Sequence, residues 1–223
     1  MIIVTGAESS LGSEISKGSK QEIYNISGET IRGGKKSIDK AIEKCARENG
    51  KVSGVINNFG INHLSWIGQT EETDEEIIIV NSIAPYWVVN KMVEIGICPG
   101  GGKIINIASA AYRTPMRCTS LYCASKAALV QMTKVMSREL SPKGWIANCI
   151  SPGFMPETKM AKLTKKQILE LRGWEEEEAK NYENSLIPMG RPTSTKEVAE
   201  AVWKLWEMPD YVNGAVIDVM GGS

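Results

Sequence analysis

The stretch IIVTGAESSLG, residues 2–12, sets the fold class of this 223-residue chain. Its β-branched start predicts a strand over residues 2–5, and the residues after the turn take helical spacing. A glycine turn in this context is typical of a dinucleotide phosphate-binding loop, because glycine lets the backbone approach a pyrophosphate and the helix N-terminus meets its charge. Gly6 and Gly12 hold two glycine positions of such a loop, and Ser10 stands where a third is usual. A plain strand–turn–helix corner is the alternative interpretation.

Beyond this loop, short β-branched runs alternate with amphipathic stretches along the whole chain. Strands are predicted over residues 22–26, 51–57, 103–108, 145–150 and 215–219, and helices over residues 11–17, 37–48, 75–93 and 195–207. This alternation is typical of parallel strands joined by crossover helices. We therefore expect an α/β fold with a doubly wound, parallel sheet of the Rossmann type.

The chain is expected to form a single domain over residues 1–223. Its length suffices for one well-buried core, and no Pro/Ser/Gly-rich linker divides it. The polar stretch 157–190 lies between two predicted strands yet has helical character. It is therefore a candidate lid over a substrate site.

Charge and cysteine content argue against several classes of protein. Lys plus Arg and Asp plus Glu cancel at 26 each, which favours neither nucleic acid nor a membrane surface as a partner. Five cysteines without a CxxC pair fit a reducing compartment, so a cytoplasmic location is expected. One histidine and scattered cysteines provide no convincing metal site. No basic signal-peptide region or membrane-spanning apolar run is visible.

The most informative chemical pair is Tyr122 and Lys126 in LYCASKAAL. Their i, i+4 spacing on a predicted helix places a phenol and an ammonium on one face. A phenol has an ordinary pKa near 10 and exchanges protons easily near neutrality only if that pKa falls to roughly 7. A neighbouring ammonium acts in that direction. The same spacing also arises by chance, so other residues must support it.

Two further residues could complete a site with this pair. Ser109 follows the predicted strand 103–108, at the sheet edge where open α/β folds bind ligands, although serine also serves there as a turn cap. Asn81 lies four residues before Pro85 in the predicted helix 75–93. Because proline has no N–H for the carbonyl of residue i−4, the Asn81 carbonyl is left free for a water that links Lys126 to solvent. A simple helix kink is the alternative.

Together these motifs resemble the classical short-chain dehydrogenase/reductase family, in particular its 3-oxoacyl-acyl-carrier-protein reductase-type members, over almost the whole chain. The family's TGxxxGxG is matched by TGAESSLG at residues 5–12, and its NNAG by NNFG at residues 57–60. SPGFMPET at residues 151–158 resembles the segment that brackets the nicotinamide carboxamide. IPMGRP and GAVIDVMGG resemble the family's C-terminal hallmarks.

The resemblance implies an oxidoreductase that interconverts an alcohol and a carbonyl with NAD or NADP, the hydride chemistry belonging to the cofactor. Tyr122 would be the general acid/base, and Lys126 would lower its pKa and hold the nicotinamide ribose. Ser109 would fix the substrate oxygen, and Asn81 would anchor a proton relay. A homodimer or homotetramer built on the helices of Asn81 and Tyr122 is also implied. The residues expected to contact the cofactor are Gly6, Ser9, Ser10, Leu11, Gly12, Asn25, Ile26, Asn57, Phe59, Gly60, Tyr122, Lys126, Pro152, Gly153 and Met155.

The chain departs from the family between its glycine loop and NNFG, where enough residues for one strand and one helix are missing. Residues 22–26 resemble the family's third strand and would pair directly with the first, giving six strands in all. The residue that selects between NAD and NADP normally lies on the missing element, so this choice is undetermined. Arg32, Lys35 and Lys36 could lie near a 2′-phosphate, with a solvated loop as the alternative.

Other classes of protein compete with an active oxidoreductase. A nucleotide-binding or assembly module without turnover is suggested by Ser10 and the shortened adenosine side, and a cofactor-free scaffold is a third class. A Ser-His-Asp hydrolase is disfavoured because His63 follows NNFG in a loop without a convincing nucleophile. Cys123 is expected to point to another helix face than Tyr122 and to serve the core. The substrate does not follow from the sequence, and the candidate pocket residues are Tyr112, Arg113, Met116 and Met155.

Overall fold

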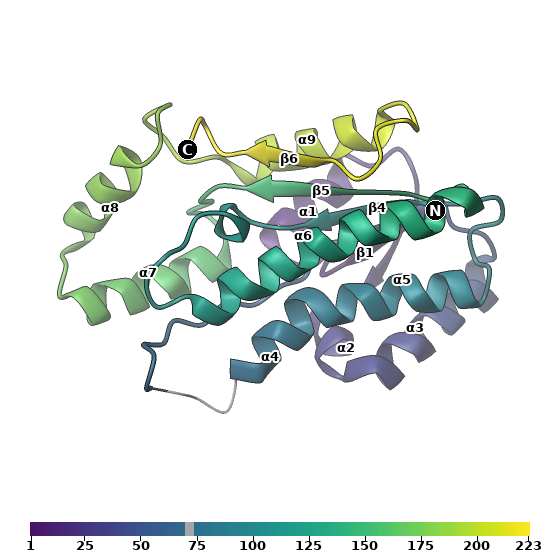
Figure 1. Cartoon of the computed structure of the whole chain (residues 1–223), viewed down its shortest axis with the longest axis horizontal. Helices are drawn as coiled ribbons and strands as arrows, with labels where there is room; N and C mark the ends of the chain where they lie inside the picture. Colours follow the sequence, from purple (N-terminus) through teal and green to yellow (C-terminus); the bar gives the residue numbers. More distant parts are fainter. Residues whose placement is uncertain (70–73) are drawn as a thin grey trace.

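The computed structural model describes residues 1–69 and 74–223 and contains a six-stranded parallel sheet (Figure 1). The strands follow the order β2-β1-β3-β4-β5-β6, and every neighbouring pair is parallel. This confirms the α/β, Rossmann-type fold expected from the sequence. The strands are β1 (Ile2–Thr5), β2 (Ile23–Ile26), β3 (Gly54–Asn57), β4 (Lys103–Ile107), β5 (Ile146–Pro152) and β6 (Val216–Val219).

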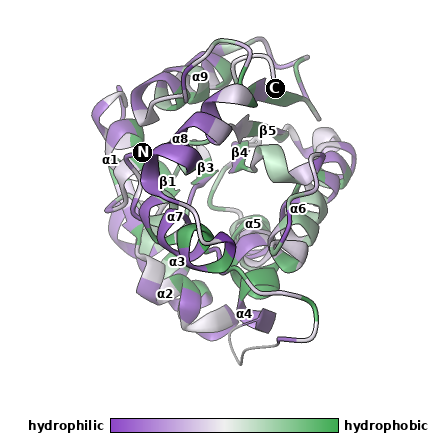
Figure 2. Ribbon diagram, turned by 90° about the vertical axis from the view of Figure 1, so that its left-hand side faces the viewer, coloured by the Kyte–Doolittle hydropathy of each residue, from purple (hydrophilic) through white to green (hydrophobic). Residues whose placement is uncertain are grey.

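Helices cover both faces of the sheet (Figure 2). Ile15 and Val202 pack with Val4 on one face, whereas Ile42 and Val88 pack on the opposite one. Successive strand residues point to opposite faces, so a strand with a helix layer on each side is apolar throughout. The helices are α1 (Ser10–Lys17), α2 (Gly28–Arg32), α3 (Gly34–Asn49), α4 (Asp74–Ile78), α5 (Ala84–Glu94), α6 (Ser120–Leu140), α7 (Lys159–Arg172), α8 (Glu176–Ser185) and α9 (Thr195–Glu207).

The shortened edge of the sheet is built as the sequence predicts. β2 pairs directly with β1, with Ile2 opposite Ile23 and Thr5 opposite Ile26. Helix α1 alone makes this crossover, and Gly18 is its C-cap. Gly18 has a right-handed backbone, so it is not needed for a left-handed cap; a Cβ there would meet the Trp203 ring nitrogen at 2.6 Å. Glycine is required because the helix end packs against α9.

Two segments differ from their predicted secondary structure. Residues 28–49 form α2 and α3, so Arg32, Lys35 and Lys36 lie on helices and not in a solvated loop. The predicted helix 75–93 is not continuous, because a π-helical turn, Ile79–Ile83, separates α4 from α5. The Ala84 N–H donates to the Ile79 carbonyl across this turn. Single π-helical turns inside α-helices are frequent at functional sites.

Gly54 begins β3, and the neighbouring strand leaves no room for a side chain at this position. It has φ +149°, and a Cβ on it would lie 1.9 Å from the Lys103 carbonyl oxygen of β4. We expect Gly54→Ala to reduce the free energy of unfolding by about 4 kcal/mol, because the β3–β4 pair must separate. The melting temperature should fall by roughly 10 °C.

Gly50 provides the matched control for this prediction. It also has a positive φ, +71°, but a Cβ on it would meet nothing within 4 Å. Gly50→Ala therefore carries only backbone strain of about 1–3 kcal/mol. The measurement is thermal unfolding of both variants. Equal melting temperatures would contradict a steric clash between a Cβ at residue 54 and β4.

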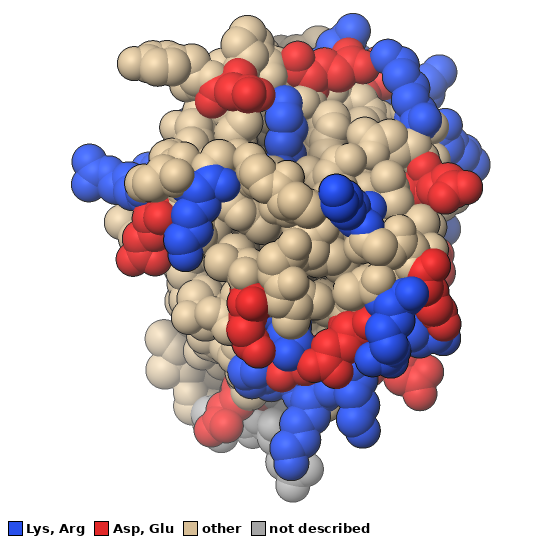
Figure 3. All heavy atoms as spheres, turned by 90° about the vertical axis from the view of Figure 1, so that its right-hand side faces the viewer, with Lys and Arg blue, Asp and Glu red and all other residues tan. Residues whose placement is uncertain are grey.

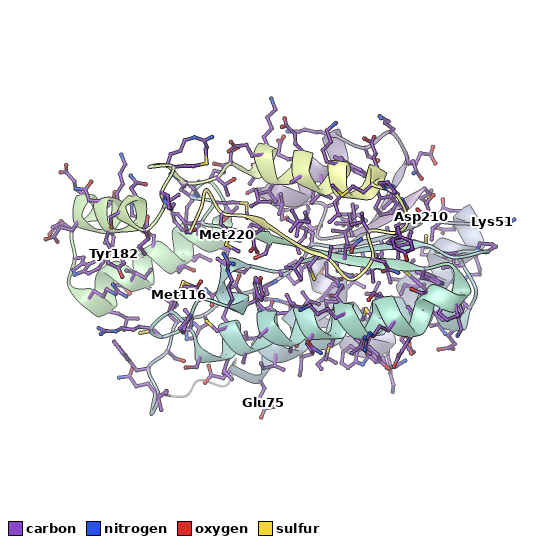
Figure 4. The ribbon with its side chains drawn as sticks, turned by 45° about the horizontal axis from the view of Figure 1, so that its top comes forward. Lys51, Glu75, Met116, Tyr182, Asp210 and Met220 are labelled. Atoms are coloured by element: carbon purple, nitrogen blue, oxygen red, sulfur yellow. The ribbon has the colours of Figure 1, made fainter. Side chains whose placement is uncertain are left out.

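The two ends of the sheet differ in what covers them. Helices α7 and α8 lie beyond the carboxyl ends of β5 and β6 (Figure 1), and Met116 and Met220 lie toward the same end (Figure 4). Lys51 and Asp210 mark the opposite end, where acidic and basic side chains are interspersed around uncharged ones (Figure 3). The candidate lid, residues 157–190, thus stands at the sheet edge where parallel α/β folds bind ligands. No described helix has the length and apolar character needed to cross a bilayer.

Candidate active site

Tyr122 and Lys126 stand on one face of α6, as their spacing predicts. Both side chains are buried, with 8% and 4% of their surfaces exposed. The Lys126 Nζ lies 5.9 Å from the centre of the Tyr122 ring and donates a hydrogen bond of 2.9 Å to the Ile107 carbonyl at the end of β4. The ammonium is therefore held at the carboxyl edge of the sheet, within about one helical turn of the phenol.

Ser109 follows β4, and its side chain lies beside the Tyr122 phenol. Its hydroxyl caps the 3-10 turn Ala110–Tyr112 by accepting the Ala111 N–H, so the predicted capping role is real. The same side chain also hydrogen-bonds with Tyr122, which lowers the pKa of that phenol. Capping and contact with the phenol are thus two uses of one rigidly placed hydroxyl.

Asn81 joins the loop after β3 to helix α6. Its Oδ1 accepts the Ile61 N–H at 2.9 Å, and its Nδ2 donates to the Ile61 carbonyl at 2.8 Å and to the Ser125 Oγ at 3.1 Å. A Cβ on Gly60 would lie 3.1 Å from the Asn81 Oδ1 and 3.4 Å from the Lys126 Nζ. Gly60 is thus flanked by both side chains. That the Asn81 carbonyl anchors a relay stays a prediction.

Burial dominates the pKa values of both Tyr122 and Lys126. Burial raises the pKa of Tyr122, and the hydrogen bond with Ser109 lowers it only partly. Burial also lowers the pKa of Lys126 to about 8, against an ordinary 10.5. The Lys126 ammonium donates its hydrogen bond to the Ile107 carbonyl. The protein alone therefore keeps Tyr122 protonated at neutral pH.

The glycine loop has the geometry of a phosphate cradle. Gly6 has φ +67°, and a Cβ on Gly12 would lie 2.1 Å from the Gly6 carbonyl oxygen, so helix α1 starts directly against the turn. Ser9 caps α1 by accepting the Gly12 N–H. Within the described chain, the Ser10 and Leu11 N–H groups at the start of α1 donate to no protein acceptor. These donors and the helix dipole fit the pyrophosphate of a dinucleotide.

Thr5 and Asn58, which are not among the predicted site residues, hold this loop by hydrogen bonds. The Thr5 Oγ1 accepts the N–H groups of Asn58 and Phe59 at 2.9 and 3.0 Å. The Asn58 Nδ2 donates to the carbonyls of Thr5 and Gly6 and to the Ser9 Oγ. The second asparagine of NNFG, directly after β3, was the sequence signal that could have identified these hydrogen bonds to the glycine loop.

Asn57 and Ile26, by contrast, do not present side chains to a ligand. Ile26 is 1% exposed and belongs to the core, so only its main chain can reach an adenine. Asn57 is 3% exposed, and its Nδ2 donates to the Asn106 Oδ1 at 2.8 Å inside the sheet. Asn106 in turn donates to the Thr133 Oγ1, which also accepts the Cys149 thiol. This buried polar chain joins β3, β4 and β5 to helix α6.

The remaining cofactor-side residues are distributed as follows. Pro152 ends β5, and the Gly153 N–H donates to the Val219 carbonyl, so the SPG turn is fixed to the last strand. Met155 packs against the apolar layer of α1 and α9. The Phe59 ring fills the space above two glycines, since a Cβ on Gly28 would lie 2.2 Å from its Cε2 and one on Gly6 would lie 3.0 Å from its Cβ.

The structure also shows what the candidate pocket residues and Cys123 contact. Arg113 contacts Asp218 at 3.1 Å and the Ser223 carbonyl at 2.8 Å, so it holds the C-terminal segment. Tyr112 packs against a small buried cluster, and Met116 is 46% exposed. Cys123 packs beside Tyr122 and contacts the Thr119 hydroxyl. Among the described residues, no group of His, Cys, Asp and Glu side chains could hold a metal ion.

Comparison with known proteins gives consistent matches. The family model described as enoyl-(acyl carrier protein) reductase matches residues 33–223. The 3-oxoacyl-(acyl-carrier-protein) reductase of Aquifex aeolicus is 30% identical over 99% of this chain and 86% of that protein. A short chain dehydrogenase family protein from Francisella tularensis superposes with a TM-score of 0.86 at 19% identity, covering 99% and 96% of the two chains. A gluconate 5-dehydrogenase from Burkholderia cenocepacia, solved with NADP and tartrate, gives 0.83 at 20% identity, covering 99% and 93%.

Proposed function

The chain belongs to the short-chain dehydrogenase/reductase family and is an NAD(P)-dependent oxidoreductase of CH–OH and C=O groups, and from this premise we propose that Tyr122 is its general acid/base. Its phenolic proton passes to the carbonyl oxygen of the substrate in reduction and returns in oxidation. The observation that supports this role best is the convergence of Ser109, Tyr122 and Lys126 at the carboxyl end of β4.

The other residues of the site position and supply the proton. Ser109 donates a hydrogen bond to the substrate oxygen, since its hydroxyl already meets the phenol. Lys126 binds the nicotinamide ribose. Its ammonium lies near both the Tyr122 ring and Gly60, and the Asn81 side chain also lies beside Gly60. The loop over residues 6–12 binds the pyrophosphate. When bound, the nicotinamide supplies or accepts the hydride.

The raised pKa of Tyr122 favours proton donation at neutral pH. A buried phenol stays protonated, so it is ready to protonate a carbonyl oxygen that gains negative charge during reduction. Oxidation needs a lower phenol pKa, and the positive charges of Lys126 and of an oxidised nicotinamide ring both act in that direction. Residues 157–190 stand at the same edge of the sheet, and we place the substrate lid there.

We also propose a homo-oligomer assembled through the helices that bear Asn81 and Tyr122. Ile79, Tyr86 and Val135 on these helical segments are 39%, 47% and 43% exposed, so they provide apolar surface for such a contact. Light scattering of the purified chain distinguishes an oligomer from a monomer. The five cysteines are unpaired, which supports the proposed cytoplasmic location.

The test of the proposed function starts with cofactor binding. Titration of the chain into NADH and into NADPH, followed by nicotinamide fluorescence, should show saturable binding of at least one dinucleotide. A panel of carbonyls with the bound reduced cofactor, and of alcohols with the oxidised one, should then yield turnover. Absence of saturable binding for both dinucleotides contradicts the proposal. Tight binding with no turnover across the panel favours the nucleotide-binding module instead.

A further inference from the structure

Glu8 lies inside the glycine loop, between Gly6 and the helix cap Ser9, and its carboxylate is held in one position. The Gly28 N–H donates to its Oε1 at 2.8 Å, and the Asn25 Nδ2 donates to its Oε2 at 2.9 Å. The Asn25 Oδ1 accepts the Ala7 N–H at 2.9 Å, so the same amide fixes the loop and orients the carboxylate. An acidic group is thus built into the place where phosphates are expected.

This carboxylate remains charged. Partial burial acts to raise its pKa, but the hydrogen bonds from Gly28 and Asn25 act against burial, and the net effect is a pKa below the ordinary value. Among the described residues, Glu8 forms no ion pair with a lysine or an arginine. A full negative charge, without a cationic partner from the protein, therefore stands beside the loop at neutral pH.

The position of Glu8 corresponds to the adenosine side of the site. β2 is the strand that pairs with β1 on this side, and Asn25 and Ile26 lie at its carboxyl end, next to the loop. In dinucleotide folds an acidic side chain in this region accepts the ribose 2′-hydroxyl, whereas an arginine accommodates a 2′-phosphate. The shortened chain supplies its acidic group from the loop itself.

Two of the three basic residues considered for a 2′-phosphate pair with acidic side chains elsewhere. Arg32 contacts Glu76 at 3.3 Å, an acidic residue of α4. Lys35 contacts Asp39 at 2.6 Å within α3. Lys36 is exposed on α3. A 2′-phosphate beside the loop would meet the charge of Glu8 first, and repulsion between like charges a few Å apart weakens binding.

We propose that Glu8, positioned by Asn25 and Gly28, makes the site select NAD(H) over NADP(H) by accepting the ribose 2′-hydroxyl and repelling a 2′-phosphate. This inference rests on the proposed function only in that the loop over residues 6–12 binds the dinucleotide. It assigns the discriminating role to a loop residue, in place of the strand and helix that this chain lacks.

The experiment compares binding of NADH and NADPH without substrate, by nicotinamide fluorescence and by calorimetry. The wild-type chain should bind NADH at least about tenfold more tightly than NADPH. Glu8→Gln keeps an acceptor for Gly28 and removes the charge, and it should narrow the ratio about tenfold, chiefly by tighter NADPH binding. Glu14→Gln is the control, because Glu14 is an acidic residue of α1 that pairs with Lys17. It should leave the ratio unchanged.

Each outcome decides a different claim. Equal or tighter binding of NADPH by the wild-type chain overturns the selection proposed for Glu8 and leaves the oxidoreductase function standing. The same holds if folded Glu8→Gln, checked by its melting temperature, keeps the wild-type ratio. The ratio of the NADPH and NADH dissociation constants can be measured on the wild-type chain alone, at several salt concentrations. A preference for NADH that weakens as salt rises supports repulsion of the 2′-phosphate by Glu8. Failure to bind either dinucleotide overturns both the inference and the proposed function.

Discussion

Replacing Tyr122 with phenylalanine is expected to lower kcat/KM for carbonyl reduction by about 10²- to 10⁴-fold, the range for loss of a positioned general acid. Phenylalanine keeps the ring that packs with Ile77 and Ala111 and removes only the hydroxyl that meets Ser109. The melting temperature and the dissociation constant for NADH should therefore change little. The measurement is steady-state reduction of a substrate found in the carbonyl panel, with binding followed by nicotinamide fluorescence.

Tyr211→Phe is the matched control for this prediction. Tyr211 is fully exposed and follows Asp210, which marks the end of the sheet opposite α7 and α8 (Figure 4). The same chemical change there should leave kcat/KM at the wild-type value. Equal activity of Tyr122→Phe and Tyr211→Phe would remove Tyr122 from the mechanism.

Replacing Lys126 with methionine is expected to separate activity from stability. The burial that lowers the pKa of Lys126 to about 8 means that its charge is costly in the folded state at neutral pH. Methionine fills a similar volume without that charge, which relieves about 3 kcal/mol, although the Ile107 carbonyl loses its donor at a cost of about 1–3 kcal/mol. We expect a melting temperature at pH 7 equal to or above that of the wild type, together with at least about a 100-fold loss of kcat/KM.

The pH dependence of unfolding isolates this contribution. Between the native pKa of about 8 and the ordinary value of 10.5, the unfolded chain holds a proton on Lys126 that the folded chain has released. The contribution of Lys126 to the free energy of unfolding therefore rises with pH through this window, and Lys126→Met lacks this rise. Lys134→Met, at an exposed position of α6, should keep the wild-type slope. Parallel slopes for wild type and Lys126→Met would contradict the burial of the charge.

The sequence predicts much of the fold because local patterns determine it. The alternation of β-branched runs with helical spacing indicates the parallel sheet. The direct pairing of β1 with β2 was expected from the strand and helix that this chain lacks relative to the family it resembles, and the register Ile2 to Ile23 confirms it. The helical spacing of Tyr122 and Lys126 likewise depends only on neighbouring residues. The π-helical turn at Ile79–Ile83 did not follow from the helical spacing, and the hydrogen bonds of Asn81 with Ile61 and Ser125 join it to residues 20 and 44 positions away in the sequence.

The site is predicted less completely than the fold, for two physical reasons. The direction of the Tyr122 and Lys126 pKa values follows from burial, which only the packed structure defines. The contact between Glu8 and Gly28 joins residues from different elements, and no short motif records it. Asn57 could have been placed better, since strand alternation puts it on the same face as Val55 and away from that of Ile56.

A structure of the chain with a dinucleotide bound tests the central claim most directly. We predict that the nicotinamide lies against Tyr122 and Ser109 at the carboxyl end of β4, with its ribose within hydrogen-bond reach of Lys126 and the pyrophosphate on the loop at residues 6–12. A nicotinamide ring bound away from the phenol, with Tyr122 still enclosed and facing no ligand, would contradict it.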